Sequence, residues 1–146
     1  MTKEELSQLY YLKREIKDQQ CRLEELESAA TSCTATITGL PKVGYISDSL
    51  AEYAVEIADL KALLALNLKK CFCELNRLNR YIQSVDDSQM RLILSLRYVN
   101  GLSWQQIAFD IGETDESYPR RKHNKFLKDS KNKKSAENAN TKGNMT

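Results

Sequence analysis

The chain has 146 residues, 41% of them hydrophobic and 29% charged, which is enough for one ordinary domain or two small ones. Its formal net charge is only +2, but residues 1–114 hold 13 Lys and Arg against 16 Asp and Glu, whereas residues 115–146 hold nine against four. This asymmetry indicates a basic module that meets nucleic acid or another anionic surface. No apolar run approaches the ~18 residues that span a bilayer, and the N-terminus lacks the pattern of a secretory signal, so we expect a cytoplasmic protein without a membrane partner.

The first predicted element is a long helix over residues 2–30, where neither proline nor glycine occurs. Apolar residues recur every three or four positions between charged ones, which is the pattern of a heptad seam. Gln19 interrupts this apolar row, and a buried polar residue in a seam can fix the register of two helices. The predicted seam positions are Leu9, Leu12, Ile16, Gln19, Leu23, Leu26 and Ala30.

A second long helix is predicted after a loop at residues 31–48, which contains two glycines and a proline. Ser49 and Glu52 have the spacing of a capping box at the start of this helix. Two such helices pair either as an antiparallel hairpin within one chain or as a coiled coil between chains, so a homodimer through residues 1–84 is a candidate assembly. The apolar row of the second helix is Leu50, Ala54, Ile57, Leu60, Leu64, Leu68, Cys71, Leu75, Leu78 and Ile82.

Residues 85–129 predict a second domain of three shorter helices. The first of these is apolar on most sides, from Met90 to Leu96, and we expect it to be buried; Trp104 in the next is expected to shield the core. Capping residues and stop signals mark the helix ends. They are Asp86 with Gln89, Asn100 with Gly101, Ser103 with Gln106, Gly112, and Thr114 or Asp115.

A helix, a short helix, a turn of three or four residues and a basic helix follow one another in this domain, which is the layout of a helix-turn-helix. In the basic helix, residues 115–128, Tyr118, Lys122 and Phe126 are expected to face the core. The other side suits DNA, because Arg can fork onto guanine, Asn can pair with adenine, and Ser and Lys contact phosphates. The candidate DNA-binding residues are Ser103, Gln105, Ser117, Arg120, Arg121, Asn124, Lys125 and Lys128.

The remaining polar residues indicate no catalytic chemistry. His123 has no acid or nucleophile at a suggestive spacing, and we interpret it as a surface residue or a phosphate contact. Cys71 and Cys73 point about 200° apart on a helix and cannot share a metal ion, so the cysteines are interpreted as buried or half-buried free thiols. We expect no metal, no cofactor and no enzymatic activity. Residues 130–146 lack apolar periodicity and predict a disordered basic tail.

Residues 96–128 read LRYVNGLSWQQIAFDIGETDESYPRRKHNKFLK. From about residue 90 onward, this stretch resembles the C-terminal promoter-reading domain of bacterial sigma factors. In that domain a Leu-Arg-aromatic run precedes a Gly-Leu-Ser/Thr turn, a short Ile-Ala helix, an Ile/Leu-Gly turn and a basic helix. The whole chain is similar to small Gram-positive phage proteins of the ArpU and RinA type, which are regarded as regulators of late genes. The resemblance implies action in the bacterial host cell, with double-stranded DNA as partner and host RNA polymerase as a second candidate partner.

The predicted architecture is an all-α fold with two long N-terminal helices, a three-helix helix-turn-helix domain and a disordered tail. The predicted function is a phage-encoded, sequence-specific transcription regulator of the late-gene activator type, which reads the major groove with residues 115–128. One alternative is a DNA-packaging subunit like the small terminase subunit, which also joins a helix-turn-helix to oligomerising helices. Another is a protein-interaction module that binds RNA polymerase without contacting DNA.

Overall fold

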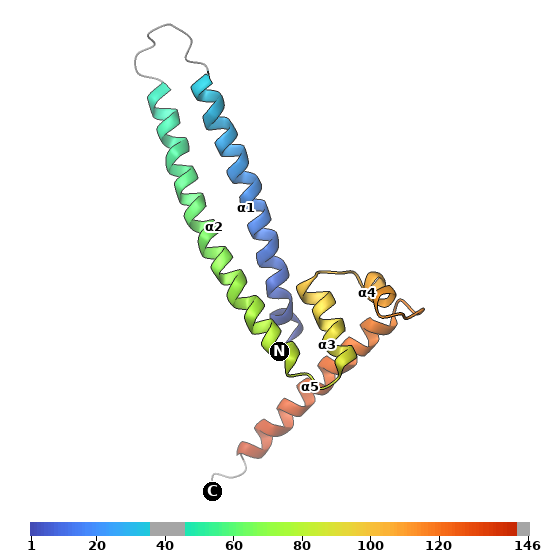
Figure 1. The fold of residues 1–146 in the computed structure, drawn as a ribbon. Helices are drawn as coiled ribbons and strands as arrows, with labels where there is room; N and C mark the ends of the chain where they lie inside the picture. Colours follow the sequence, from blue (N-terminus) through green and yellow to red (C-terminus); the bar gives the residue numbers. More distant parts are fainter. Residues whose placement is uncertain (36–45, 143–146) are drawn as a thin grey trace. The chain divides into compact units, whose positions relative to one another are not determined.

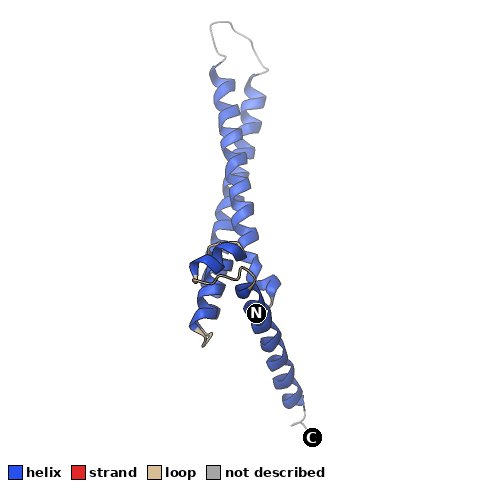
Figure 2. Cartoon of the chain, turned by 90° about the vertical axis from the view of Figure 1, so that its right-hand side faces the viewer, coloured by secondary structure: helices blue, strands red, loops and turns tan. Residues whose placement is uncertain are grey.

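The computed structural model describes residues 1–35 and 46–142, and every regular element in these ranges is a helix (Figures 1 and 2). The all-α prediction is therefore confirmed for the described residues. The elements are α1 (Lys3–Ala35), α2 (Ile46–Gln83), α3 (Ser88–Leu94), the π-helical turn η1 (Ser95–Val99), α4 (Trp104–Asp110) and α5 (Tyr118–Lys142). The chain divides into two compact units, which we name the hairpin unit, Tyr11–Glu74, and the head unit, Met1–Tyr10 with Leu75–Thr146.

In the hairpin unit, α1 and α2 lie side by side and antiparallel (Figure 1). The predicted α1 seam is correct here, because its positions from Leu12 to Ala30 are all buried or half-buried. Two exposed ion pairs join the helices, Arg22 with Glu56 at 2.9 Å and Lys61 with Glu27 at 3.0 Å. Exposed pairs of this kind contribute at most about 1 kcal/mol each, so burial of the seam stabilises the pairing.

The α2 side of the seam differs from the predicted row at two positions. Ala54 and Leu68 were expected to face inward, but both are exposed, Leu68 at 48%. Tyr53 and Asn67 face inward instead. The observed seam steps by alternating three and four residues, whereas the predicted row took the apolar neighbours Ala54 and Leu68, each one position further along the helix. Asn67 is only 6% exposed, so a polar residue holds a central seam position that hydrophobicity alone assigned to Leu68.

Gln19 and Asn67 form a polar pair across the seam. The Asn67 Nδ2 group donates to Gln19 Oε1 at 3.2 Å. A hydrogen bond of this kind is satisfied only when the two amides lie opposite each other, so it favours one register of α1 against α2. Gln19 was predicted to interrupt the apolar seam, and in the structure its side chain has a hydrogen-bond partner, Asn67, in the same chain.

The loop between the long helices is shorter than predicted at both ends, since α1 continues to Ala35 and α2 already begins at Ile46. Ser49 and Glu52, expected to form a capping box, thus lie inside α2 rather than at its start. Residues 36–45 of the predicted loop lie outside the described residues.

The head unit places α3, η1, α4 and α5 around an apolar core. Asp87, and not Asp86, caps α3: its carboxylate accepts from the backbone N–H groups of Gln89 at 2.9 Å and Met90 at 3.2 Å. Of the apolar residues in the predicted helix, Leu92 is 45% exposed and does not join the core. The buried apolar residues of the unit are Leu6, Leu9, Leu78, Ile82, Val85, Met90, Ile93, Leu94, Tyr98, Ile107, Ala108 and Leu127.

The predicted helix through Asn100 changes its hydrogen-bond pattern over its last five residues. The Asn100 N–H donates to Ser95 O at 3.1 Å, which is the wider π-type spacing. The chain then turns at Gly101, whose φ of 74° is readily accessible only to glycine. The residue pattern does not predict the π turn. This turn contains Tyr98, a buried core residue.

The capping box predicted for α4 is confirmed. Ser103 Oγ accepts from the Gln106 N–H at 3.3 Å, and Gln106 Oε1 accepts from the Ser103 N–H at 2.9 Å. Gly112 follows α4 with a φ of 76°, as its predicted role in closing that helix requires. The connection to α5 spans residues 111–117 and is longer than the predicted three- or four-residue turn.

Helix α5 begins later and ends later than predicted. It starts at Tyr118 rather than directly after Thr114 or Asp115, and Pro119 sits in its first turn, where a missing N–H costs little. It then continues to Lys142, so helix occupies residues 130–142, for which disorder was expected. No helix in the described ranges is long and apolar enough to cross a membrane.

We expect Asn67→Leu to lower the free energy of unfolding by about 1 kcal/mol, because Gln19 loses its partner inside a half-buried seam. Combining it with Gln19→Leu should recover this loss, since both polar groups are then replaced by apolar ones. Urea unfolding of the full chain, followed by circular dichroism, measures the two variants and the Gln19→Leu control. Losses that simply add in the double variant would contradict a direct interaction between the two side chains.

Candidate nucleic-acid interface

Helix α5 exposes a row of polar and basic side chains along one side. All of its predicted DNA-binding positions are solvent-exposed, and their spacing of three and four residues places them on a continuous face. Together they run over about three helical turns, from Ser117 directly before α5 to Lys128 in its first half. These residues are Ser117, Arg120, Arg121, Asn124, Lys125 and Lys128.

The opposite face of α5 is buried, and it differs from the prediction by one position. Pro119, His123 and Leu127 repeat every four residues and are all buried. Tyr118 and Phe126, expected to anchor this face, are only half-buried and flank it. The spacing of Pro119 and Leu127 was the signal available in the sequence, but a histidine between them was interpreted as a surface residue.

His123 is the centre of the buried face, with a relative exposure of 0%, so its predicted role as a surface or phosphate-contacting residue is wrong. Its ring lies between two aromatic side chains, with centroid distances of 5.6 Å to Tyr98 and 5.1 Å to Trp104. Arg97 covers the Trp104 ring at 4.7 Å, a cation–π contact. Trp104 is half-buried over this cluster, as expected of a residue that shields the core.

Both ring nitrogens of His123 have a polar partner. Nδ1 lies 3.1 Å from Asn124 Oδ1, and Nε2 lies 2.7 Å from the Tyr98 hydroxyl. Because a carboxamide oxygen can only accept, Nδ1 carries the proton and donates to Asn124, and Nε2 accepts from Tyr98. The cluster therefore satisfies a buried neutral imidazole and ties Asn124, a predicted base-reading residue, to the core by its side-chain oxygen.

Burial dominates the protonation of this cluster. It lowers the pKa of His123 below its usual 6.5, although the hydrogen bond with Asn124 acts in the other direction. Burial also raises the pKa of Tyr98 from 10.0 to about 12. At neutral pH the pair is uncharged, which suits a buried site.

Acidic side chains lie among the predicted DNA-binding residues at the start of α5. Asp115 accepts from the Ser117 backbone N–H at 2.8 Å and also pairs with Arg121 at 2.5 Å. Gln105, exposed on α4, donates through Nε2 to Glu116 at 2.9 Å. Arg121 and Gln105 thus already have protein partners, while both remain exposed to solvent.

Ser103 occupies a different position from the α5 row. Its Oγ accepts a hydrogen bond in the capping box and so stabilises the start of α4. It is also exposed, which leaves its remaining hydrogen-bonding capacity accessible.

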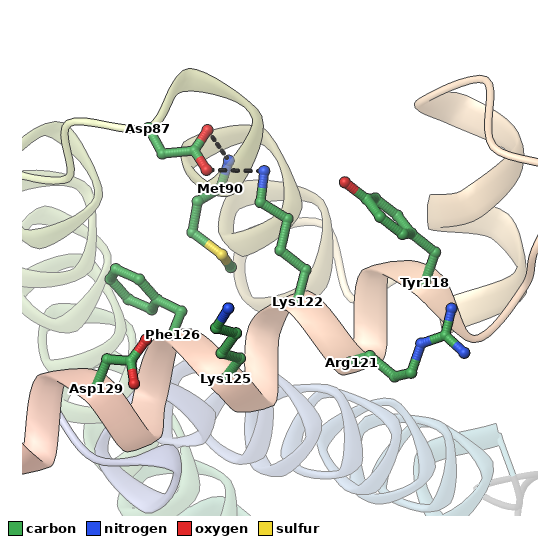
Figure 3. Close-up of a pocket in the computed structure, with 8 residues that line it drawn as sticks. All are labelled: Asp87, Met90, Tyr118, Arg121, Lys122, Lys125, Phe126 and Asp129. Atoms are coloured by element: carbon green, nitrogen blue, oxygen red, sulfur yellow. Dashed lines mark hydrogen bonds and ion pairs between the residues drawn. The ribbon is translucent and has the colours of Figure 1, made fainter.

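A hollow of about 560 Å³ lies beside the basic row and is lined partly by it (Figure 3). Lys122 reaches across this hollow from α5 to the start of α3, where it pairs with Asp87 at 2.7 Å and hydrogen-bonds Gln89. The hydrogen bond from Lys122 is the main reason why the pKa of Asp87 lies below its usual value. Lys122 thus serves the packing of α5 against α3, as its assignment to the inner side implied.

The side chains of three of the four cysteines are described, and that of Cys33 lies outside the described residues. Cys21 and Cys73 are exposed free thiols and Cys71 is half-buried, so the expectation that all are sheltered is wrong for the first two. No group of three or more His, Cys, Asp or Glu within residues 1–35 and 46–142 has the arrangement of a metal site.

Comparison of the chain with models of protein families, with curated proteins and with solved structures finds no match.

We expect Tyr98→Phe to destabilise the head unit by about 1–3 kcal/mol, because Nε2 of buried His123 loses its only hydrogen-bond donor. Tyr53→Phe, at a half-buried position of the hairpin unit, is a control for loss of a tyrosine hydroxyl elsewhere in the chain. Thermal and urea unfolding give the comparison. Equal effects of the two substitutions would show that the Tyr98–His123 contact contributes nothing specific.

The stability of the head unit should also depend on pH through His123. The pKa of His123 is lowered in the folded chain, so below about pH 6.5 the unfolded chain binds a proton that the folded chain does not bind. The contribution of neutral His123 to the free energy of unfolding is therefore fully present above that pH and decreases as the pH falls below it. His123→Gln keeps a hydrogen-bonding side chain but cannot titrate. Unfolding curves between about pH 5 and 8 should therefore slope for the wild type and stay level for this variant; parallel curves would exclude His123 as the cause.

Proposed function

We propose that the head unit is a helix-turn-helix module that binds double-stranded DNA, with α5 as the recognition helix in the major groove and α4 as the supporting helix. The protein is then a sequence-specific transcription regulator, as the resemblance to sigma-factor promoter-reading domains and to phage late-gene regulators implies. The observation that carries the proposal is the division of α5 into a buried face around His123 and an exposed face of Arg, Lys, Asn and Ser.

The chemistry of the exposed face matches the groups that DNA offers. Arg120 and Arg121 can fork onto O6 and N7 of guanine, and Asn124 can present its amide to adenine. Lys125 and Lys128 lie further along the helix and supply positive charge for the phosphates on either side of the groove. A surface with only lysines would favour phosphate binding alone, whereas this mixture suits base contacts as well.

The rigidity of α5 supports base reading. His123 is anchored by Tyr98 and Trp104 on the inner face, and Asn124, the next residue, bonds to the same imidazole. Side chains that recognise base edges need a fixed helix behind them, because specificity depends on placement to within fractions of an ångström. The anchored core of α5 meets this requirement better than a solvated charged helix would.

Asp115 and Glu116 modulate the charge of the surface without removing it. Their contacts with Arg121 and Gln105 are exposed, and exposed pairs contribute at most about 1 kcal/mol. A DNA phosphate or base can therefore displace Asp115 from Arg121, or Glu116 from Gln105, at a small cost in free energy. The expectation that the chain has no enzymatic activity belongs to this proposal, since DNA reading requires no reacting group.

The proposal is tested with DNA duplexes selected from a random pool by the full-length wild type. Arg120→Ala should weaken binding to the selected duplex by about 1–3 kcal/mol more than binding to unselected DNA. Lys17→Ala, which removes an exposed positive charge on α1, should leave this difference unchanged. Fluorescence anisotropy at several salt concentrations measures both. No enrichment of any sequence, or equal losses on all DNA, would overturn sequence-specific reading.

A second variant addresses the acidic neighbours. Asp115→Asn retains the oxygen that accepts from Ser117 but loses the charge that holds Arg121. It should bind both selected and unselected DNA more tightly than the wild type does, in the same anisotropy assay. Weaker binding would mean that Asp115 positions Arg121 productively instead of competing with DNA for it.

A further inference from the structure

The outer face of α2 in the hairpin unit carries a second row with heptad spacing. Its members step by four, three, four, three and four residues, and all are exposed, including Val55 at 62% and Leu66 at 50%. At 100° per residue this row lies about 160° around the helix from the seam that faces α1, so the intrachain pairing does not use it. The row consists of Val55, Asp59, Ala62, Leu66, Lys69 and Cys73.

The surroundings of this row are unusually apolar for a solvent-facing helix surface. Leu63 is 46% exposed, and Ala58 and Ala65 are exposed as well. The ion pairs Arg22–Glu56 and Lys61–Glu27, which join α1 to α2, use Glu56 and Lys61 of α2, not the charged members of the row. An exposed row with heptad spacing, in which apolar residues alternate with one acidic and one basic residue, is a pattern typical of a helix–helix interaction surface.

The row is complementary to itself when it is reversed. About the level of Leu64, its members form three pairs: Val55 opposite Cys73, Asp59 opposite Lys69, and Ala62 opposite Leu66. Each pair joins either opposite charges or side chains that fit by size, a large leucine against a small alanine and two residues of intermediate volume at the ends. An antiparallel dimer with a twofold axis repeats every pair twice, because such an interface uses the same patch on both copies.

The charges discriminate between the two orientations of a second copy. In a parallel pair Asp59 would face Asp59 and Lys69 would face Lys69, and both contacts are repulsive. In the antiparallel pair each acid faces a base, which is the device by which coiled-coil helices select their partners. This complementarity, more than the exposed apolar area itself, identifies the occupant as a second copy of the chain.

We propose that the chain forms an antiparallel homodimer in which the outer faces of two α2 helices, from Val55 to Cys73, pack against each other. Two hairpins joined in this way make a four-helix arrangement around the α2–α2 contact. The apolar members supply most of the stabilisation, and the two Asp59–Lys69 contacts fix the orientation. The interface lies wholly in the hairpin unit and does not depend on DNA binding by the head unit.

The first test is the solution mass of the full-length chain, whose monomer has a mass of 16.7 kDa. The wild type should sediment as a dimer, and Leu66→Glu, which places a charge at the centre of the row, should sediment as a monomer with unchanged helical content. Leu68→Glu is the matched control, because Leu68 is the same residue type on the same helix at 48% exposure and points about 160° away. It should remain dimeric. A monomeric wild type, a larger oligomer, or a dimeric Leu66→Glu variant overturns the proposal.

Cross-linking tests the orientation. In a chain with Cys21, Cys33 and Cys71 replaced by alanine, Cys73 of one copy lies about 27 Å along the helix axis from Cys73 of the other in the antiparallel dimer. Mild oxidation should therefore give no covalent dimer. Adding Val55→Cys brings a thiol opposite Cys73, and oxidation should then cross-link the two copies. Cross-linking through Cys73 alone, or none after Val55→Cys, overturns the antiparallel arrangement.

Discussion

The proposed DNA surface depends on the burial of His123. A helix as charged as α5 has no strong apolar stripe to orient it, and Pro119 and Leu127 alone offer little area. The imidazole adds a ring in tilted contact with Tyr98 and Trp104, with a hydrogen bond at each nitrogen. Because this ring faces inward, the helical repeat turns Arg121, Lys125 and Lys128 outward. The orientation of the basic row is thus a consequence of one satisfied polar group in the core.

This dependence explains why the sequence located the surface better than it located the core beneath it. The capping box of α4, the stop at Gly112 and the exposed basic side of α5 follow from local rules, and each of these is found in the structure. The inner face of α5 does not follow from such rules, because it contains a histidine that hydrophobicity assigns to the surface. Its burial requires Tyr98, which lies in a π turn with no signature in the residue order.

The hairpin shows the same limit in a second form. The periodicity of α1 identified its seam, including Gln19, because one polar position in a regular apolar row is conspicuous. On α2 the apolar residues cover both faces, so leucines compete for the inward position and the true inward residue, Asn67, is polar. A row predicted from hydrophobicity alone therefore includes Leu68, whereas in the structure Asn67 occupies that position of the seam. Apolar residues in excess of what one seam needs are themselves informative, since they mark the second face.

The acidic residues beside the basic row bear on how the surface would discriminate among DNA sequences. Asp115 and Glu116 precede α5 near its N-terminus, where the helix dipole favours negative charge and where a DNA phosphate would otherwise be attracted. In the proposed DNA complex this acidic position would reduce the phosphate contribution to affinity, which is the same for every sequence. Contacts from Arg120 and Asn124 to base edges would then make up a larger share of the binding energy. A moderately charged recognition helix is therefore better suited to choosing a site than a uniformly basic one, provided that its side chains are held as rigidly as the core around His123 holds them.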